Sequence, residues 1–264
     1  MRHAAIIIVS IATAAISSGC GAASPESTQK TVRQSEQFYE AASIAWFEEG
    51  NTLAAIRNLT RAVETNPDND EAHYLLGIIR MSRGEYEAAE KHLSTVIRLR
   101  TEKNDVAGLS GAQNNIGVLY IHLKRYDEAV QVLKASSEEV MNREPWLAFG
   151  NLGWAYIEMG EYDKAVEVLR RAMFDQPKYC VGLYRIGQAL YLKHDYSSAL
   201  AHLQKALEVP EPGCDRIQEA YQLIGMSRLR LEKTEEAKEA FLQCTEINEV
   251  STAGIECRGA LDSL

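Results

Sequence analysis

A recurring pattern of small and aliphatic residues runs through most of the chain. An aliphatic residue followed by glycine occurs at five spaced positions, with the glycines at Gly77, Gly117, Gly153, Gly187 and Gly225. They lie 40, 36, 34 and 38 residues apart; an alanine follows each by twelve residues, and a leucine or phenylalanine comes four residues later. Self-similarity at this period is typical of repeat arrays, in which each unit buries its apolar face against its neighbours. The pattern therefore predicts a repeat array.

The repeated unit resembles the tetratricopeptide repeat. The fourth copy matches best, through Leu152, Gly153, Tyr156, Gly160, Tyr162, Ala165, Leu169, Ala172 and Pro177. The resemblance implies an all-α fold, a right-handed superhelical solenoid of about six units of two antiparallel helices. The expected units are 36–69, 70–103, 110–143, 146–179, 180–213 and 218–251. Spacers are expected at 104–109 and 214–217, and residues 252–264 are expected to form a C-terminal capping helix.

The first residues have the character of an export signal. A positive start at Arg2 precedes an apolar run of 13 residues, 4–16, which is too short to span a bilayer as a helix. Small residues then lead to Cys20, the pattern of a bacterial lipoprotein whose cysteine is acylated. We expect a signal peptide at 1–19 and a lipidated, flexible tether at 20–35. The alternative is an ordinary secretory signal with an incidental cysteine, because Ser17 stands where lipoproteins usually have leucine.

Composition narrows the class of protein. The chain has 264 residues, 46% of them hydrophobic and 25% charged, with a formal net charge of −9. These values argue against wholesale disorder, and an acidic balance without a dense basic cluster argues against a nucleic-acid partner. The sequence contains no H-E-x-x-H, C-x-x-C or G-x-S-x-G motif. We therefore expect no enzyme, no metal, no cofactor and no small-molecule substrate.

A partner-binding groove is expected on the inner wall, which the first helix of each unit faces in this repeat family. Eleven of the twelve residues at two inner positions are apolar, the exception being Gln188, and a third position adds two tyrosines. The expected groove residues are Ile44, Phe47, Tyr74, Ile78, Met81, Val118, Ile121, Trp154, Ile157, Tyr184, Tyr191, Met226 and Leu229. An exposed apolar stripe usually marks a binding surface. The alternative is that curvature or the tether buries this wall within the molecule.

Two polar features of the repeats do not point to a binding function. Asn115 and Asn151 occupy a slot where asparagine is common in this repeat family, so they are assigned no function. The groove also lacks the lysine and asparagine set that clamps a chaperone's C-terminal carboxylate, which disfavours that function.

Four cysteines remain after Cys20. They are Cys180, Cys214, Cys244 and Cys257, and four cysteines allow three connectivities. Export would place them where disulfides persist. The repeat register makes Cys180–Cys214 and Cys244–Cys257 neighbours, which favours these two disulfides. The alternative for Cys244 is a small buried hydrophobe.

The whole arrangement resembles the pilotins of the type IV pilus system, the Tgl and PilF/PilW family. The resemblance rests on the signal and Cys20, the short polar segment after it, and the six repeats that fill the remaining chain. It implies a lipid-anchored, periplasm-facing outer-membrane protein that binds secretin subunits and helps them assemble; Gly21, where aspartate would favour the inner membrane, agrees with that location. The alternatives are another periplasmic adaptor, for barrel assembly or a cell-wall hydrolase, and, from a different class, an enzyme or its regulatory subunit.

Overall fold

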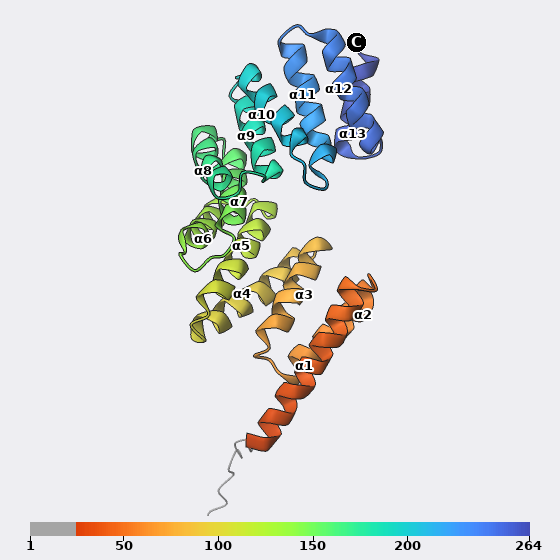
Figure 1. Cartoon of the computed structure of the whole chain (residues 1–264). Helices are drawn as coiled ribbons and strands as arrows, with labels where there is room; N and C mark the ends of the chain where they lie inside the picture. The colour runs from red at the N-terminus through yellow and green to blue at the C-terminus, as the bar shows by residue number, and fades with distance from the viewer. Residues whose placement is uncertain (1–24) are drawn as a thin grey trace, which may run out of the picture.

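The computed structural model describes residues 25–264, which form a stack of α-helices (Figure 1). The helices are α1 (Pro25–Phe47), α2 (Thr52–Thr65), α3 (Asp70–Ser82), α4 (Tyr86–Glu102), α5 (Val106–His122), α6 (Tyr126–Glu138), α7 (Pro145–Glu158), α8 (Tyr162–Asp175), α9 (Cys180–Leu192), α10 (Tyr196–Glu208), α11 (Gln218–Arg230), α12 (Thr234–Ile247) and α13 (Thr252–Asp262). A short 3₁₀ helix, Cys214–Arg216, precedes α11. The expected solenoid fold is therefore confirmed.

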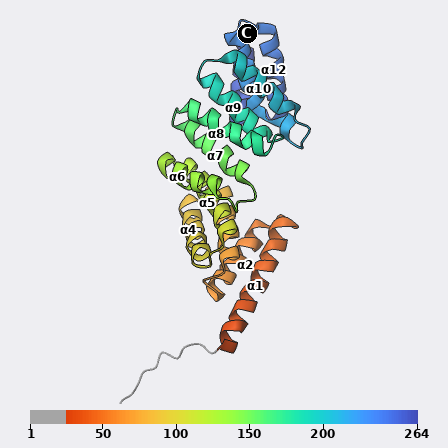
Figure 2. The same ribbon diagram turned by 60° about the vertical axis from the view of Figure 1, so that its left-hand side comes forward.

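Consecutive helices pack as antiparallel pairs, and the pairs stack into a curved array (Figures 1 and 2). The first helices of neighbouring pairs also contact one another, from α3 to α5, α7, α9 and α11. Figure 1 shows α4, α6 and α8 on the outer side of the curve and α3, α5 and α7 further in. The first helices from α3 to α11 thus form one continuous face, which is the inner, concave wall at α3, α5 and α7.

Close approach within a pair explains the recurring glycine and leucine. A Cβ added to Gly153 would lie 2.5 Å from Cγ of Leu169, and one added to Gly117 would lie 2.4 Å from Cγ of Leu133. Contacts this short do not occur between real side chains, so only glycine lets the two helices pack at this distance. The same contact recurs in other pairs, where Gly187 meets Leu203 and Gly225 meets Phe241.

The turn inside each pair has one residue with left-handed backbone conformation at the same place. Its φ is positive at Gly50, Gly84, Lys124, Gly160, His194 and Glu232, with values from 59° to 77°. Glycine adopts this conformation without strain, whereas a side chain with a Cβ is disfavoured there. Three of the six turns therefore carry a non-glycine residue in an unfavourable conformation.

The N-terminal helix differs from the sequence prediction. Residues 25–35 were expected in a flexible tether, but α1 begins at Pro25. Glu26 in its first turn favours the helix through the macrodipole, and tertiary contacts fix the segment. The buried Ser35 hydroxyl donates to the carbonyl oxygen of Ala62 at 2.8 Å and accepts from Nδ2 of Asn69 at 2.8 Å. The remaining tether, the signal segment and Cys20 lie outside the described residues.

Both predicted spacers contain helical residues. Residues 106–109 are the first turn of α5, because the Asp105 side chain accepts a hydrogen bond from the Gly108 amide and caps the helix. Most of the second spacer forms the 3₁₀ helix.

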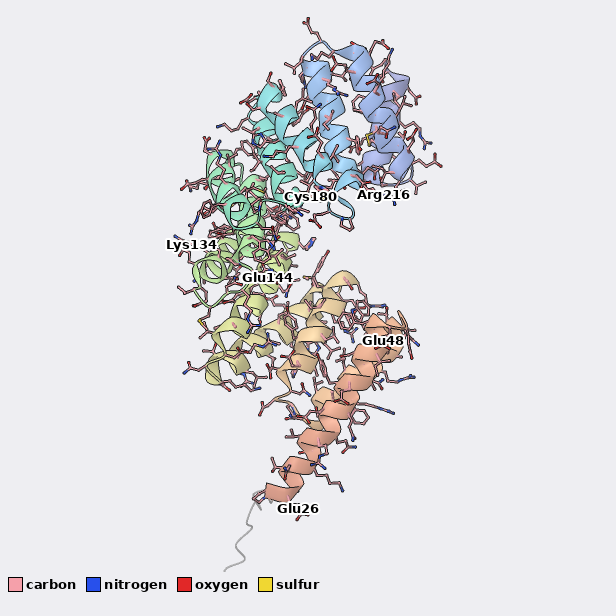
Figure 3. All side chains as sticks on the ribbon, in the orientation of Figure 1. Glu26, Glu48, Lys134, Glu144, Cys180 and Arg216 are labelled. Atoms are coloured by element: carbon pink, nitrogen blue, oxygen red, sulfur yellow. A yellow bond between two sulfur atoms is a disulfide. The ribbon has the colours of Figure 1, made fainter. Side chains whose placement is uncertain are left out.

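The structure contains the disulfides Cys180–Cys214 and Cys244–Cys257, with Cα–Cα distances of 5.8 and 6.3 Å (Figure 3). They tie α9 to the 3₁₀ helix and α12 to α13.

None of the helices in residues 25–264 is both long enough and apolar enough to cross a membrane.

Candidate functional site: the concave wall

The residues predicted for the groove differ widely in exposure. Ile44, Phe47 and Met226 are exposed, with 47%, 72% and 37% of their surface accessible. Half-buried residues are Tyr74, Ile78, Met81, Val118, Trp154, Tyr184, Tyr191 and Leu229. Ile121 and Ile157 are buried at 3% and 4%, in clusters with core alanines of adjacent helices. The prediction that they face the groove is wrong, because the packing between neighbouring pairs covers this part of α5 and α7.

A row of aromatic contacts joins three consecutive helix pairs, from the start of α4 to α5 and α7 of the wall. The ring of Tyr86, at the start of α4, stacks on His122 with centroids 5.5 Å apart and planes 9° apart. His122, at the end of α5, meets Trp154 of α7 edge-on at 5.3 Å. The Trp154 indole also donates to Oε1 of Glu158 at 3.0 Å. Aromatic pairs with these spacings stabilise one another beyond simple area burial.

A polar row runs beside it. Nδ2 of Asn115 donates to the Tyr74 hydroxyl at 2.6 Å, which joins α5 to α3. Nδ2 of Asn151 donates to Oδ1 of Asn114 at 2.9 Å, which joins α7 to α5. Between α3, α5 and the start of α7 lies a hollow of about 210 Å³, lined by Tyr74, Ser110, Gly111, Asn114, Asn115, Asn142, Glu144 and Leu147. Side-chain amides thus line the wall next to the aromatic row.

Arg185 on α9 is where the two rows meet. Its Nη1 donates to the carbonyl oxygen of Gly150 at 2.7 Å and to Oδ1 of Asn151 at 3.1 Å. Its guanidinium carbon lies 4.9 Å from the centroid of the Trp154 ring, within the range of a cation–π interaction. Within the described chain, no carboxylate lies within 4.0 Å of this guanidinium. Burial lowers the pKa of Arg185, since nothing nearby fully compensates its charge.

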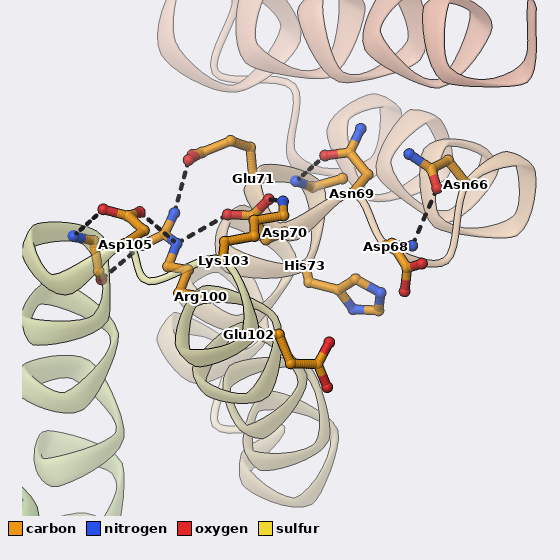
Figure 4. A network of polar contacts seen from close by, with 12 residues as sticks. Asn66, Asp68, Asn69, Asp70, Glu71, His73, Arg100, Glu102, Lys103 and Asp105 are labelled. Carbon is orange, nitrogen blue, oxygen red and sulfur yellow. Dashed lines mark hydrogen bonds and ion pairs between the residues drawn. The ribbon is translucent and has the colours of Figure 1, made fainter. Parts of the chain in front are cut away.

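Arg100 gives the opposite electrostatic picture (Figure 4). Its Nε donates to Asp70 at 3.0 Å, its Nη2 to Glu71 at 2.7 Å and its Nη1 to the carbonyl oxygen of Gly108 at 2.9 Å. Burial opposes the charge, but the hydrogen bond to Asp70 and the charges of Glu71 and Asp70 outweigh it and raise the pKa of Arg100. Arg100 therefore has a structural role, in which it fixes α5 against α3 and α4.

Sequence reasoning missed several members of this wall. His122 stands at an inner position of the repeat, but the search for an apolar stripe passed over polar side chains. Arg185 stands at the slot of Asn115 and Asn151, which was assigned no function. Asn151 was set aside as a common repeat residue, yet it links Asn114 to Arg185. Attention to polar residues at equivalent positions of neighbouring units would have found these contacts.

The described residues contain no group of three or more histidine, cysteine or acidic side chains placed to hold a metal ion.

Four family models match the chain, at residues 47–112, 109–173, 151–213 and 218–250, and each describes a tetratricopeptide repeat. The chain belongs to the tetratricopeptide-repeat family. None of these models describes a catalytic family, and proteins built from this repeat are generally scaffolds that bind other proteins.

Solved structures share this fold along most of the chain. Pseudomonas aeruginosa PilF is similar with a TM-score of 0.67 and 19% identity, over 87% of this chain and 99% of PilF. PilW, described as a widely conserved type IV pilus biogenesis factor, is similar with a TM-score of 0.71 and 15% identity, over 84% and 97% of the two chains. MamA is similar with a TM-score of 0.56 and 23% identity, over 69% and 95%. No curated protein sequence matches the chain.

Proposed function

We propose that this tetratricopeptide-repeat protein is a pilotin, an outer-membrane lipoprotein that binds secretin subunits and promotes their assembly for type IV pilus biogenesis. The observation that carries the proposal is the extent of the similarity to PilF and PilW. It spans 84–87% of this chain and 97–99% of the two solved chains. The Cys20 lipidation pattern is independent support from the sequence.

The concave wall is the proposed secretin-binding surface. It combines exposed or half-buried aromatic and aliphatic side chains with amides and one cation, a composition that suits a polypeptide ligand. Each large apolar side chain buried by a partner contributes roughly 1.5–3 kcal/mol before the entropic cost of association. A few anchors such as Trp154 and Tyr191 would therefore give micromolar binding.

The proposal is tested by affinity isolation from a bacterial envelope extract, with the full protein as bait. Recovery of the secretin supports the pilotin function. Recovery of barrel-assembly or cell-wall proteins without secretin would contradict it and favour a different periplasmic adaptor.

The anchor has its own test. Replacing Cys20 by alanine should release the protein to the soluble periplasmic fraction or stop its processing. Outer-membrane fractionation of the Cys20→Ala variant in a strain without the secretin would contradict lipid anchoring; using that strain removes retention by the proposed partner.

A further inference from the structure

Arg185 has unused hydrogen-bonding capacity. Its two hydrogen bonds both come from Nη1. Nε and Nη2 make no hydrogen bond within the described chain, and neither belongs to the buried polar atoms that lack a partner. These N–H groups therefore reach solvent. A guanidinium presents Nε and Nη2 as a planar fork that matches the two oxygens of a carboxylate.

The position of this fork is fixed before any ligand arrives. The Gly150 carbonyl and Asn151 hold one side of the guanidinium, and the Trp154 ring covers it. Asn151 is in turn held by Asn114, so two neighbouring helices position the side chain. A pre-positioned side chain loses little further entropy when it binds.

The missing counter-ion of Arg185 also points to an acidic ligand. Arg100 and Arg125 are each paired with carboxylates, whereas no ion pair forms at Arg185 within the described chain. Tyr179, Tyr184 and then Glu158 favour the charge of Arg185, but the Glu158 carboxylate accepts from the Trp154 indole and lies outside ion-pair distance of the guanidinium. A partly buried cation without a counter-ion is unfavourable until a ligand supplies one.

We propose that Arg185 binds an acidic side chain of a polypeptide segment that lies in the concave wall, with an apolar or aromatic residue of the same segment beside Trp154 and His122. The inference deepens the proposed function, on which it rests for the use of this wall, and names the chemistry of the contact.

The test is a selection of random 15-residue peptides displayed on phage through their C-termini, so that no free C-terminal carboxylate is present. The full protein is the bait, alongside Arg185→Gln as the neutral variant. The matched control is Arg171→Gln, because Arg171 also lies over an aromatic ring, Phe149 at 4.2 Å, but is exposed on α8. Circular dichroism verifies that each variant keeps its helix content.

Selected peptides should contain Asp or Glu next to a large apolar residue. A selected peptide and its Glu→Gln or Asp→Asn analogue then complete a double-mutant cycle with the wild type and Arg185→Gln. Either change alone should weaken binding by about tenfold, and the second change should add nothing, which corresponds to a close charge pair at an interface. Arg171→Gln should bind within about twofold of the wild type.

Enrichment without acidic residues, a failure to enrich any sequence, or additive effects in the cycle would overturn the inference. These outcomes leave the pilotin proposal standing if the secretin is still isolated. Conversely, an acidic selection that depends on Arg185, with no secretin recovered from envelopes, supports the carboxylate site and contradicts the pilotin proposal.

Discussion

The guanidinium of Arg185 lies 4.9 Å from the centroid of the Trp154 ring, and the two side chains come from neighbouring helix pairs. Trp154 was predicted as a groove residue, whereas Arg185 was not. The pair brings the largest aromatic surface of the wall together with its unpaired cation. One side of the indole packs against the buried residues of α5 to α7, and Arg185 lies against its ring, so the pair stands where the core meets the wall.

Arg185 and Arg100 should respond oppositely to the same substitution. Arg185→Met keeps much of the volume and removes an uncompensated charge, so the free energy of unfolding should stay the same or rise by about 1 kcal/mol. Arg100→Met leaves Asp70 with only the more exposed Lys103 as a partner and removes the ion pair with Glu71, which should cost about 3 kcal/mol. Urea unfolding of both variants measures the difference. A loss in Arg185→Met as large as that in Arg100→Met would show that Arg185 is a structural residue.

Turns with a non-glycine residue at positive φ should be open to stabilisation. His194→Gly and Glu232→Gly should each raise the free energy of unfolding by up to about 1 kcal/mol, because glycine relieves the left-handed strain but adds entropy to the unfolded chain. Gly160→Ala, at the equivalent turn of the fourth unit, should lower it by a similar amount. Thermal or urea unfolding of the three variants measures these changes. Destabilisation by both glycine substitutions would contradict the shared turn geometry.

The C-terminal disulfides should stabilise the array without contributing to recognition. The loops they close span 34 and 13 residues, for which the chain-entropy model gives about 4 and 3 kcal/mol. Replacing either pair by serine should therefore increase proteolysis and lower cellular abundance. Mass spectrometry of the non-reduced protein checks the pairing, and binding assays on the surviving protein check recognition. A Cys180–Cys244 link, or four free thiols, would contradict the structure.

A histidine pair predicts a loss of stability in mild acid. Nδ1 of His73 on α3 lies 2.9 Å from Nδ1 of His92 on α4. Burial, followed by the charges of His73, Arg80 and Lys91, lowers the pKa of His92 from an ordinary 6.5 to about 4. Burial also lowers the pKa of His73. Arg98 opposes the charge of His73, whereas Asp68 and Asp70 favour it. Both pKa values are lower in the folded state, so the unfolded chain binds more protons below pH 6.5. The contribution of this histidine pair to the free energy of unfolding should be fully present above about pH 6.5 and should be lost progressively from there towards pH 4.

The slope should be at most about 1.4 kcal/mol per pH unit for each histidine that is protonated only in the unfolded chain. Urea unfolding from pH 7.5 to 4.5 measures it. His92→Asn should flatten the profile, whereas His202→Asn, a control on α10, should leave it unchanged. An unaltered slope in His92→Asn would show that carboxylates elsewhere dominate the acid response.

Local spacing explains how much of the fold was predictable. Gly153 and Leu169 stand sixteen residues apart and meet across one helix pair. The same spacing recurs in the other units, so the repeat pattern of the sequence predicts the contact. The helical segment 25–35 was not predictable in this way. It is polar apart from Val32, and it is fixed by contacts of Ser35 with residues 27 and 34 positions away.

The candidate site was less predictable for a related reason. Apolar positions of the wall follow from the repeat, but their exposure depends on how closely successive pairs stack, which buries Ile121 and Ile157 and leaves Trp154 half-buried. The role of Arg185 depends on the carbonyl of Gly150 and the amide of Asn151, 35 and 34 residues away. Curvature of the whole array brings these groups together.

The central claim is that the concave wall receives the secretin, and in-cell photo-crosslinking tests it most directly. A photoreactive phenylalanine analogue is placed at Tyr191 on the wall or at Phe174, a matched aromatic control on α8 with 87% of its surface exposed. Both proteins should restore secretin multimers, and mass spectrometry identifies the adducts. The account predicts a secretin adduct from position 191 that is absent from position 174 and is reduced by Arg185→Gln. A secretin adduct from position 174 and none from position 191 would contradict it.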